Sequence, residues 1–214
     1  IMARLVIADD HPIFRRGLCD VLENSRRFQC VGEAGDGPTA LKHINEFHPD
    51  IAIVDIGMPQ LDGLQVIAQA RRRPDSPRFV VLTLHDDPAL IERAFEEGAS
   101  GYLLKEDAEA ELLVCLDRVL TGRRYLSRSL VKDSDSPPES NEEAVRGLTA
   151  AERRVLDLVG DYRTSGEIGE LLNISIRTVQ NHRAHIVKKL GLHGPNALLR
   201  FAARYRAQSG HSEK

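Results

Sequence analysis

The sequence predicts an α/β domain with a doubly wound, five-stranded parallel sheet, followed by a small all-α domain. Over the first half of the chain, short apolar runs alternate with helical patterns. A stretch rich in Ser, Pro and acidic residues comes next, and only helical patterns follow it. Continuous apolar runs are typical of parallel strands covered on both faces, and five β/α alternations imply a doubly wound sheet.

The strands are expected where runs of Leu, Ile, Val and Phe occur, at 4–8, 28–34, 51–55, 79–83 and 101–105. Between them, apolar residues three or four positions apart predict helices that each bury one stripe. These helices are expected around 14–22, 40–47, 64–68, 90–95 and 108–120. Gly98 and Gly122 follow the fourth and the fifth and are expected to end them.

The composition divides the chain into residues 1–123, a linker at 124–146 and a helical domain at 147–214. The part of the linker from Asp133 to Glu143 is too polar to bury the apolar surface that folding requires.

Helix caps and stops organise the last part of the chain. Two helices joined by a short turn, the second of them basic, form the helix-turn-helix pattern. Thr149 and Glu152 form a capping box that begins the first helix. A short second helix is expected at 165–172, and Ser175 caps a third helix that runs to Leu190 and stops at Gly191. Pro195 begins a fourth helix, which runs to about Ala203.

Composition narrows the class of protein. The chain lacks Trp and has few aromatic residues, so its cores must be aliphatic, and no apolar run approaches the roughly 18 residues of a membrane-spanning helix. The first residues turn acidic too early for a secretory signal, so we expect a cytoplasmic protein. The cysteines Cys19, Cys30 and Cys115 are isolated in the sequence and are interpreted as buried thiols, not as a metal site or a disulfide framework.

Charge is distributed unevenly along the chain. From Arg146 to Arg206 there are eleven positive and five negative residues, an excess of +6, whereas the formal net charge of the whole chain is −3. The remaining residues therefore sum to −9. A basic module joined to an acidic one suggests a polyanion partner for the basic half.

Reactive side chains follow the predicted strands at the edge where function gathers in open parallel sheets. Asp9 and Asp10 follow the first strand, Asp55 the third, Thr83 the fourth and Lys105 the fifth. Three carboxylates repel one another, and Mg²⁺ would relieve this while leaving room for phosphate oxygens. A carboxylate beside such a metal can attack phosphorus, with the hydroxyl and the ammonium group holding the phosphoryl oxygens. Any one of these residues could simply be a helix cap or a solvated charge. Four strand ends that carry matching groups in the right order are much harder to explain by chance.

The stretches ADDHPIFRRGL, IVDIGMPQLDGLQV, VVLTLHDD and GASGYLLKED resemble the receiver domain of response regulators, a flavodoxin-like fold, over residues 3–121. The resemblance implies that Asp55 is the phosphoacceptor. It also implies that Asp10, Asp55 and the backbone carbonyl of Gly57 bind Mg²⁺ directly, while Asp9 acts mainly through water.

The same resemblance assigns further roles around the acids. Thr83 is the switch hydroxyl and Lys105 the phosphate partner, while Gly63 helps to shape the loop after the phosphoacceptor. Tyr102 occupies an aromatic switch position, although an ordinary core or surface tyrosine is an equally open interpretation. His11 is expected to serve as a cap or turn residue and to take no part in the chemistry.

The stretches LTAAERRVLDLVG and EIGELLNISIRTVQNHRAHIVKKLGL resemble the LuxR-type helix-turn-helix of the NarL/FixJ subfamily, over about residues 146–206. In the major groove, Gln and Asn can pair with adenine and Arg with guanine, while Arg and Lys also neutralise phosphates. By this resemblance Gln180, Asn181 and Ala184 point to bases. Contacts to the DNA backbone or to the core are implied for Arg177, Thr178, His182, Lys188 and Lys189.

The helical half departs from the subfamily pattern in two places. Gln180 stands where Lys is usual, which removes one phosphate or guanine contact. In the turn before the second helix, Tyr162 stands where Gly is usual and Gly166 where Lys is usual. Because Gly166 and Gly169 each cost roughly 1 kcal/mol against Ala inside a helix, we expect a less rigid scaffold helix or an altered loop.

The two resemblances together imply a response regulator that is not an enzyme. A histidine kinase would phosphorylate Asp55, Thr83 would move toward the phosphoryl group, and Tyr102 would turn inward. The surface formed by the fourth and fifth helices, or by the first and fifth, would then change its binding partner. This change would favour a homodimer on double-stranded DNA, and the bound dimer would regulate transcription.

Three alternatives are weighed. A DNA-binding protein without phosphorylation is disfavoured by the complete acid set. A phosphatase or phosphotransferase with Asp55 as nucleophile is disfavoured because Gly57 stands where a second acid would be needed. In the third, the basic helix grips a protein partner, and a steep salt dependence of binding to duplex DNA would count against it.

Overall fold

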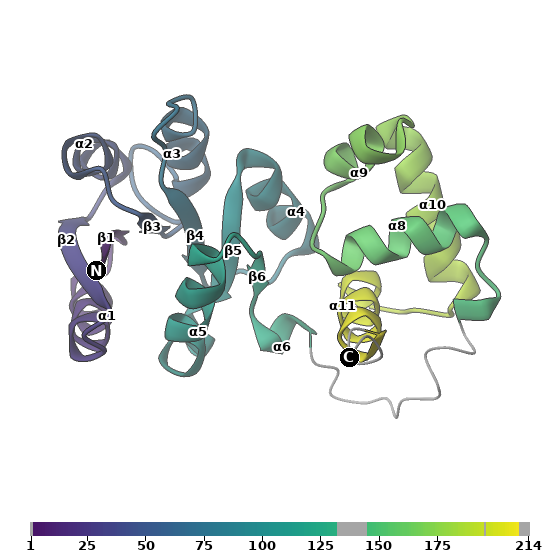
Figure 1. Ribbon diagram of the computed structural model, residues 1–214. Coiled ribbons are helices and arrows are strands. Elements are labelled where there is room, and N and C mark those ends of the chain that lie inside the picture. Colours follow the sequence, from purple (N-terminus) through teal and green to yellow (C-terminus); the bar gives the residue numbers. More distant parts are fainter. Residues whose placement is uncertain (1, 132–144, 195, 210–214) are drawn as a thin grey trace. The chain divides into compact units, whose positions relative to one another are not determined.

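The computed structural model describes residues 2–131, 145–194 and 196–209 (Figure 1). The chain divides into two compact units. One runs up to Asp86 and from Arg93 to Ser127, and the other comprises residues 87–92 and the chain from Arg128 onward.

The first unit contains a wholly parallel sheet in the strand order β2-β1-β3-β4-β5-β6. All five predicted strands are present, so the doubly wound α/β fold is confirmed. The strands are β1 (Ala3–Ala8), β2 (Phe28–Ala34), β3 (Ile51–Val54), β4 (Arg78–Thr83), β5 (Ala99–Leu104) and β6 (Tyr125–Leu126).

The sixth strand corrects the predicted five-stranded sheet. Tyr125 and Leu126 pair with Gly101 and Tyr102 of β5, and both are buried. They lie within the range 124–146 that the sequence analysis assigned to the linker, because two residues are too few to display a strand pattern.

Helices cover both faces of this sheet. Helices α1 and α5 pack on one face, where Leu5, Ile7, Ile51 and Ile53 point, and α2 and α3 lie on the opposite side (Figure 1). Because side chains alternate along a strand, each strand contributes to both cores. The helices are α1 (Pro12–Asn24), α2 (Gly37–Phe47), α3 (Gly63–Ala70) and α5 (Ala108–Leu120), with a 3₁₀ turn η1 (Lys105–Asp107). Helix α4 (Pro88–Glu97) begins in the segment 87–92 of the second unit and ends in the first unit.

The second unit is helical, as expected. Its helices include α6 (Arg128–Val131), α8 (Ala150–Gly160), α9 (Ser165–Leu172), α10 (Ile176–Lys189) and α11 (Ala197–Ser209). They surround a separate core that includes Val155, Leu156, Ile168, Val179 and Ile186.

The predicted caps are present in the helical unit. Thr149 forms a full capping box with Glu152, and the Ser175 hydroxyl accepts a hydrogen bond from the backbone N–H of Thr178. Gly191 takes the left-handed conformation expected of a helix stop, with φ +59°. The residues from Asp133 to Glu143 and Pro195 lie outside the described part of the chain, and the last helix extends to Ser209, beyond the predicted end.

The expectation of buried thiols is confirmed for Cys19 and Cys115 and is wrong for Cys30. Cys115 is fully buried, but the sulfur atoms of Cys19 and Cys30 lie 3.0 Å apart and Cys30 is partly exposed. The contact arises because α1 packs against β2, which brings together residues whose spacing resembles no known motif. Among the described residues, no helix has the length and apolarity to cross a membrane.

Candidate functional site

Three aspartates meet at the carboxyl edge of the sheet. Asp9 and Asp10 directly follow β1, and Asp55 directly follows β3, the neighbour of β1. One ligand atom from each of these residues and from His11 lies within 4.8 Å of the others. Asp9 and Asp55 are almost fully buried, whereas Asp10 is more exposed. The sheet order therefore gathers the acids as the sequence predicted.

Lys105 lies in the same pocket. It follows β5, and its ammonium Nζ lies 2.7 Å from Oδ2 of Asp9 and 2.7 Å from Oδ2 of Asp55. The centroid of the Phe14 ring lies 5.1 Å from the same ammonium, within the range of a cation–π contact. Burial alone would lower the pKa of Lys105, but the hydrogen bonds to Asp55 and Asp9 outweigh it and leave the pKa raised. Lys105 is therefore held as a cation between two buried carboxylates.

Thr83 and Tyr102 both contact the loop after β4. The Thr83 hydroxyl, 1 % exposed, accepts a hydrogen bond from the backbone N–H of His85 at 3.3 Å. The Tyr102 hydroxyl donates to the carbonyl of the same residue at 2.7 Å, and its side chain is fully buried. The buried position of Tyr102 fits both a core tyrosine and a switch residue, and through His85 the side chain shares a loop with Thr83.

Two glycines lie close to Asp55 in the segment that follows it. The backbone N–H of Gly57 donates to Oδ1 of Asp55 at 3.3 Å, so Gly57 borders the carboxylate. A Cβ atom at Gly63 would overlap the backbone carbonyl oxygen of Asp55. A side chain at Gly63 would thus push α3 away from the pocket.

His11 belongs to the acid cluster, which the sequence analysis did not anticipate. It stands at the N-cap position of α1, but its side chain makes no capping hydrogen bond. Instead its Nδ1 atom lies 2.8 Å from Asp10 Oδ1 and 3.2 Å from Asp9 Oδ1. Its position directly after two acids was the signal that could have indicated this.

The donor set suits a hard divalent cation. Carboxylate oxygens are the ligands that Mg²⁺ prefers, and a magnesium site in a protein uses one or two of them together with water and phosphate oxygens. Ligand atoms of Asp10 and Asp55 lie within 4.8 Å of each other. Lys105 offsets part of their negative charge. Asp10 remains solvent-accessible, so a cation can still reach the cluster.

A second candidate surface lies on α10. Val179 and Ile186 are buried in the helical core, so the opposite face of the helix is left outward. Its exposed side chains recur three or four residues apart, as a helix that enters a groove requires. They include Arg177, Gln180, Asn181, Ala184 and Lys188.

Two predicted DNA contacts have partners inside the domain. The Thr178 hydroxyl lies 2.8 Å from that of Ser175 and forms part of the helix cap. Lys189 donates to Oε2 of Glu152 at 2.7 Å. Lys189 and the backbone N–H of Thr149 lower the pKa of Glu152 to about 2. The charge of Lys189 is thus offset by a buried carboxylate, unlike that of Lys188.

Comparison with known proteins assigns each unit to a family. Residues 5–117 match the response regulator receiver domain, and residues 146–202 match the luxR family of bacterial regulatory proteins. The protein named "Probable transcriptional regulatory protein NarL" from Mycobacterium tuberculosis is 34% identical to this chain. That match covers 95% of this chain and 94% of the relative.

Solved structures agree with this assignment. A LuxR-family two-component response regulator from Aurantimonas is 34% identical with a TM-score of 0.58, over 61% of this chain and 93% of its own. The response regulator RcsB in complex with DNA is 27% identical with a TM-score of 0.55, over 95% of this chain and 98% of its own. The described chain therefore belongs to the two-component response regulators of the NarL/FixJ type, non-enzymatic transcriptional regulators that join a receiver domain to a LuxR-type DNA-binding domain.

Proposed function

We propose that phosphorylation of Asp55 by a histidine kinase controls the binding of this regulator to double-stranded DNA as a homodimer. The observation that carries the proposal is the position of Lys105, whose ammonium lies 2.7 Å from the carboxylates of both Asp9 and Asp55. A buried carboxylate with a fixed cation beside it, at the carboxyl edge of the sheet, is the arrangement that a phosphoacceptor requires.

The reaction follows from these contacts. An oxygen of Asp55 attacks the phosphorus, and the bond from phosphorus to the donor breaks. Bound Mg²⁺, held by Asp10, Asp55 and the carbonyl of Gly57, would offset the charge on the phosphoryl oxygens. Lys105 is held protonated, so it can transfer its hydrogen bond from Asp55 to a phosphoryl oxygen.

The response would pass through Thr83 and Tyr102. A phosphoryl group on Asp55 offers acceptor oxygens to the Thr83 hydroxyl, and a movement of Thr83 toward them would draw it away from the backbone N–H of His85. The same loop holds the Tyr102 hydroxyl through the His85 carbonyl. Release of this loop is the local change that phosphorylation would produce.

On the DNA side, we propose that α10 enters the major groove. Gln180, Asn181 and Ala184 would face the base edges, while Arg177 and Lys188 would neutralise phosphates. A homodimer would place two such helices about one turn of DNA apart, roughly 10 bp. Thr178 and Lys189 would then act chiefly by holding the helix in place.

The test uses the full chain and a small-molecule phosphodonor such as acetyl phosphate, with intact mass as the readout. We expect the wild type to gain one phosphoryl group with Mg²⁺ and to lose this gain when a chelator removes the metal. Asp55→Asn should gain none. Asp20→Asn removes an exposed acid of α1 that forms an exposed i,i+4 pair with Arg16, so it should behave as wild type.

The DNA half is tested with duplexes selected from a random library. Phosphodonor should tighten binding of the selected duplex by the wild type and by Asp20→Asn, but not by Asp55→Asn. Equal labelling of Asp55→Asn, or a donor response that survives this substitution, would overturn the assignment of Asp55.

A further inference from the structure

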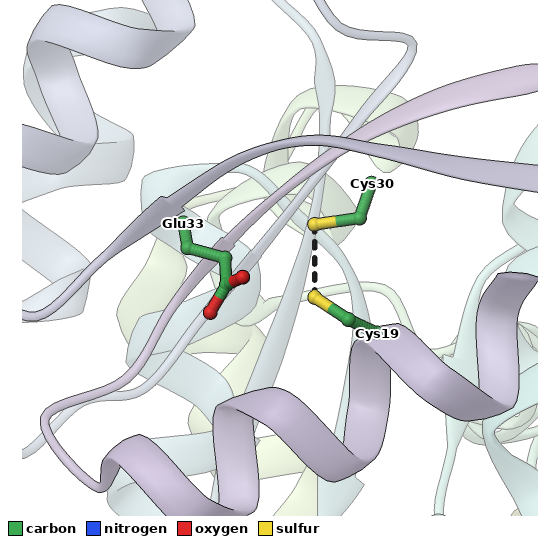
Figure 2. A group of neighbouring side chains, drawn as sticks. All are labelled: Cys19, Cys30 and Glu33. Carbon is green, nitrogen blue, oxygen red and sulfur yellow. Dashed lines mark hydrogen bonds between the residues drawn. The ribbon is translucent and has the colours of Figure 1, made fainter.

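Two cysteine side chains outside the acid pocket lie in contact. Cys19 is on the buried face of α1 and Cys30 is on β2, with their Sγ atoms 3.0 Å apart (Figure 2). A disulfide bond requires about 2.05 Å between sulfur atoms, so an approach of about 1 Å would join them. A shift in strand register helps to set this position, because Cys30 pairs with Leu5 whereas the next pair is Val6 with Gly32. Such irregularities re-aim the neighbouring side chains.

The two thiols differ in exposure and acidity. Cys19 is 2 % exposed, whereas Cys30 is partly accessible to solvent. The S–H group of Cys19 donates to Sγ of Cys30, and this bond lowers the pKa of Cys30 although burial and the Glu33 carboxylate act in the opposite direction. The same bond and burial raise the pKa of Cys19. Cys30 is therefore the sulfur that a small oxidant meets first, and it has the greater thiolate character.

We propose that Cys19 and Cys30 form a reversible, intramolecular disulfide when the protein meets a peroxide. In the first step the Cys30 sulfur attacks one peroxide oxygen, the O–O bond breaks, and one molecule of water leaves as Cys30 becomes a sulfenic acid. In the second step the Cys19 sulfur attacks the Cys30 sulfur, the S–O bond breaks, and the hydroxyl leaves with the thiol proton as a second water. Two thiols are oxidised and one peroxide is reduced.

A metal ion is the competing occupant, since Glu33 lies beside the two sulfurs (Figure 2). Two thiolates on a tetrahedral zinc, each about 2.3 Å from the metal, stand about 3.8 Å apart. The observed 3.0 Å lies between that spacing and the distance of about 2.05 Å in a disulfide, so either occupant requires the sulfurs to move by about 1 Å. Glu33, the third ligand that a zinc ion would use, is already engaged with Arg15, whose Nε lies 3.4 Å from Oε2. The engagement of Glu33 favours the disulfide.

Cys115 supplies an internal control. It lies on α5 and is fully buried in the core, and burial raises the pKa of its thiol. It should therefore stay reduced under conditions that oxidise the pair. The proposal does not depend on phosphorylation or DNA binding, so it can fail or succeed independently of the proposed function.

The experiment treats the reduced full chain with hydrogen peroxide, alkylates the remaining thiols after unfolding, and maps the peptides by mass spectrometry. We expect the number of alkylated thiols to fall from three to one, with a peptide that links Cys19 to Cys30 and with Cys115 alkylated. The midpoint of thermal unfolding should rise, because the bond restricts the unfolded chain, and dithiothreitol should reverse both changes.

Matched variants sharpen the result. Cys115→Ser should still form the linked peptide, while Cys30→Ser should leave the Cys19 thiol alkylated. Any of four outcomes would overturn the proposal: three unreacted thiols, Cys30 over-oxidised without a bond to Cys19, a dimer linked through Cys30, or stoichiometric Zn²⁺ binding that protects the reduced pair from alkylation. Mapping of the wild type decides between these outcomes even if a variant fails to fold.

Discussion

Glu152 links two parts of the helical unit through one carboxylate. It accepts a hydrogen bond from the backbone N–H of Thr149, which completes the cap of α8, and another from Lys189 at the end of α10. It is 3 % exposed, so solvent screens these bonds little. Loss of its charge would therefore weaken both a helix cap and the attachment of α10.

We predict that this carboxylate makes the stability of the helical unit pH-dependent in acid. The pKa of Glu152 falls from its ordinary 4.5 to about 2, with Lys189 as the largest cause. A lowered pKa means that the stabilisation is complete above pH 4.5 and is lost as pH falls toward 2. In chemical denaturation at pH values from 7 to 2, the wild type should have a higher free energy of unfolding than Glu152→Gln at neutral pH. This difference should disappear as pH falls from 4.5 toward 2.

The control for Glu152 is Glu170→Gln, which removes an exposed acid from the neighbouring helix α9. It should track the wild type throughout the titration. A constant difference between wild type and Glu152→Gln at every pH would contradict the assignment of the effect to this carboxylate.

For individual residues, the sequence predicted the contacts made by near neighbours but not those between distant parts of the chain. Local signals such as Thr149 with Glu152 three residues later, and acids directly after strands, were enough to predict the cap and the acid cluster. The partner of Lys189 could not be predicted, since 37 residues separate it from Glu152 and only tertiary packing brings them together. The Cys19–Cys30 contact was missed for the same reason.

Helix α9 contains two glycines, Gly166 and Gly169, whose surroundings differ. The chain turns back after α9 through Asn173, whose φ is +54°. A Cβ atom at Gly169 would lie 2.9 Å from the carbonyl oxygen of Ile174 in that turn, whereas one at Gly166 would meet nothing closer than 3.8 Å. The expectation that both glycines merely loosen the helix is therefore wrong for Gly169, which the tight turn requires.

We predict opposite effects of alanine at these two positions. Gly166→Ala should stabilise the protein by about 0.4–1 kcal/mol, because it restricts the unfolded chain without strain. Gly169→Ala should destabilise it by about 1–3 kcal/mol, because the methyl group forces the turn away from the helix. Urea denaturation of both variants checks this, and equal effects of the same sign would refute it.

The elements with strong patterns were predicted well, and the short or strained ones were not. Long amphipathic stripes gave the helices, and apolar runs gave β1 to β5. Strand β6 has only two residues, so no periodicity could reveal it. Tyr162 adopts φ +57°, the left-handed conformation that Gly prefers. The backbone shape of this turn thus survives the replacement of the usual Gly, which sequence alone could not establish.

For the whole molecule, charge separation is the feature that bears on DNA binding. The acidic residues gather in the sheet-containing half, and the basic excess lies between Arg146 and Arg206. Not every basic side chain contributes equally, however: Lys188 and Lys189 are both exposed, but Lys189 donates to the buried carboxylate of Glu152. This division could not be predicted from the sequence, where the two lysines are adjacent.

We predict that these neighbouring lysines differ in their effect on the salt dependence of DNA binding. Lys188→Ala should reduce the slope of log K against log salt by about 0.9, the value for one lost phosphate contact. Lys189→Ala should change the slope less and instead lower stability, because it leaves Glu152 unpaired. Fluorescence anisotropy across a salt series measures the slopes, and equal slope changes would contradict the distinction.

Strand β6 also determines where the chain can be cut. It covers the main chain of β5, and Ser127 adds two hydrogen bonds, from its backbone N–H to the Tyr102 carbonyl and from the Leu104 N–H to its own hydroxyl. A fragment that ends at residue 123 would leave β5 as a bare, apolar edge, the kind of surface that recruits another chain. We expect that fragment to aggregate and one that ends at Ser127 to stay monodisperse, as light scattering would reveal. Equal solubility of the two would mean that β6 is dispensable as an edge cover.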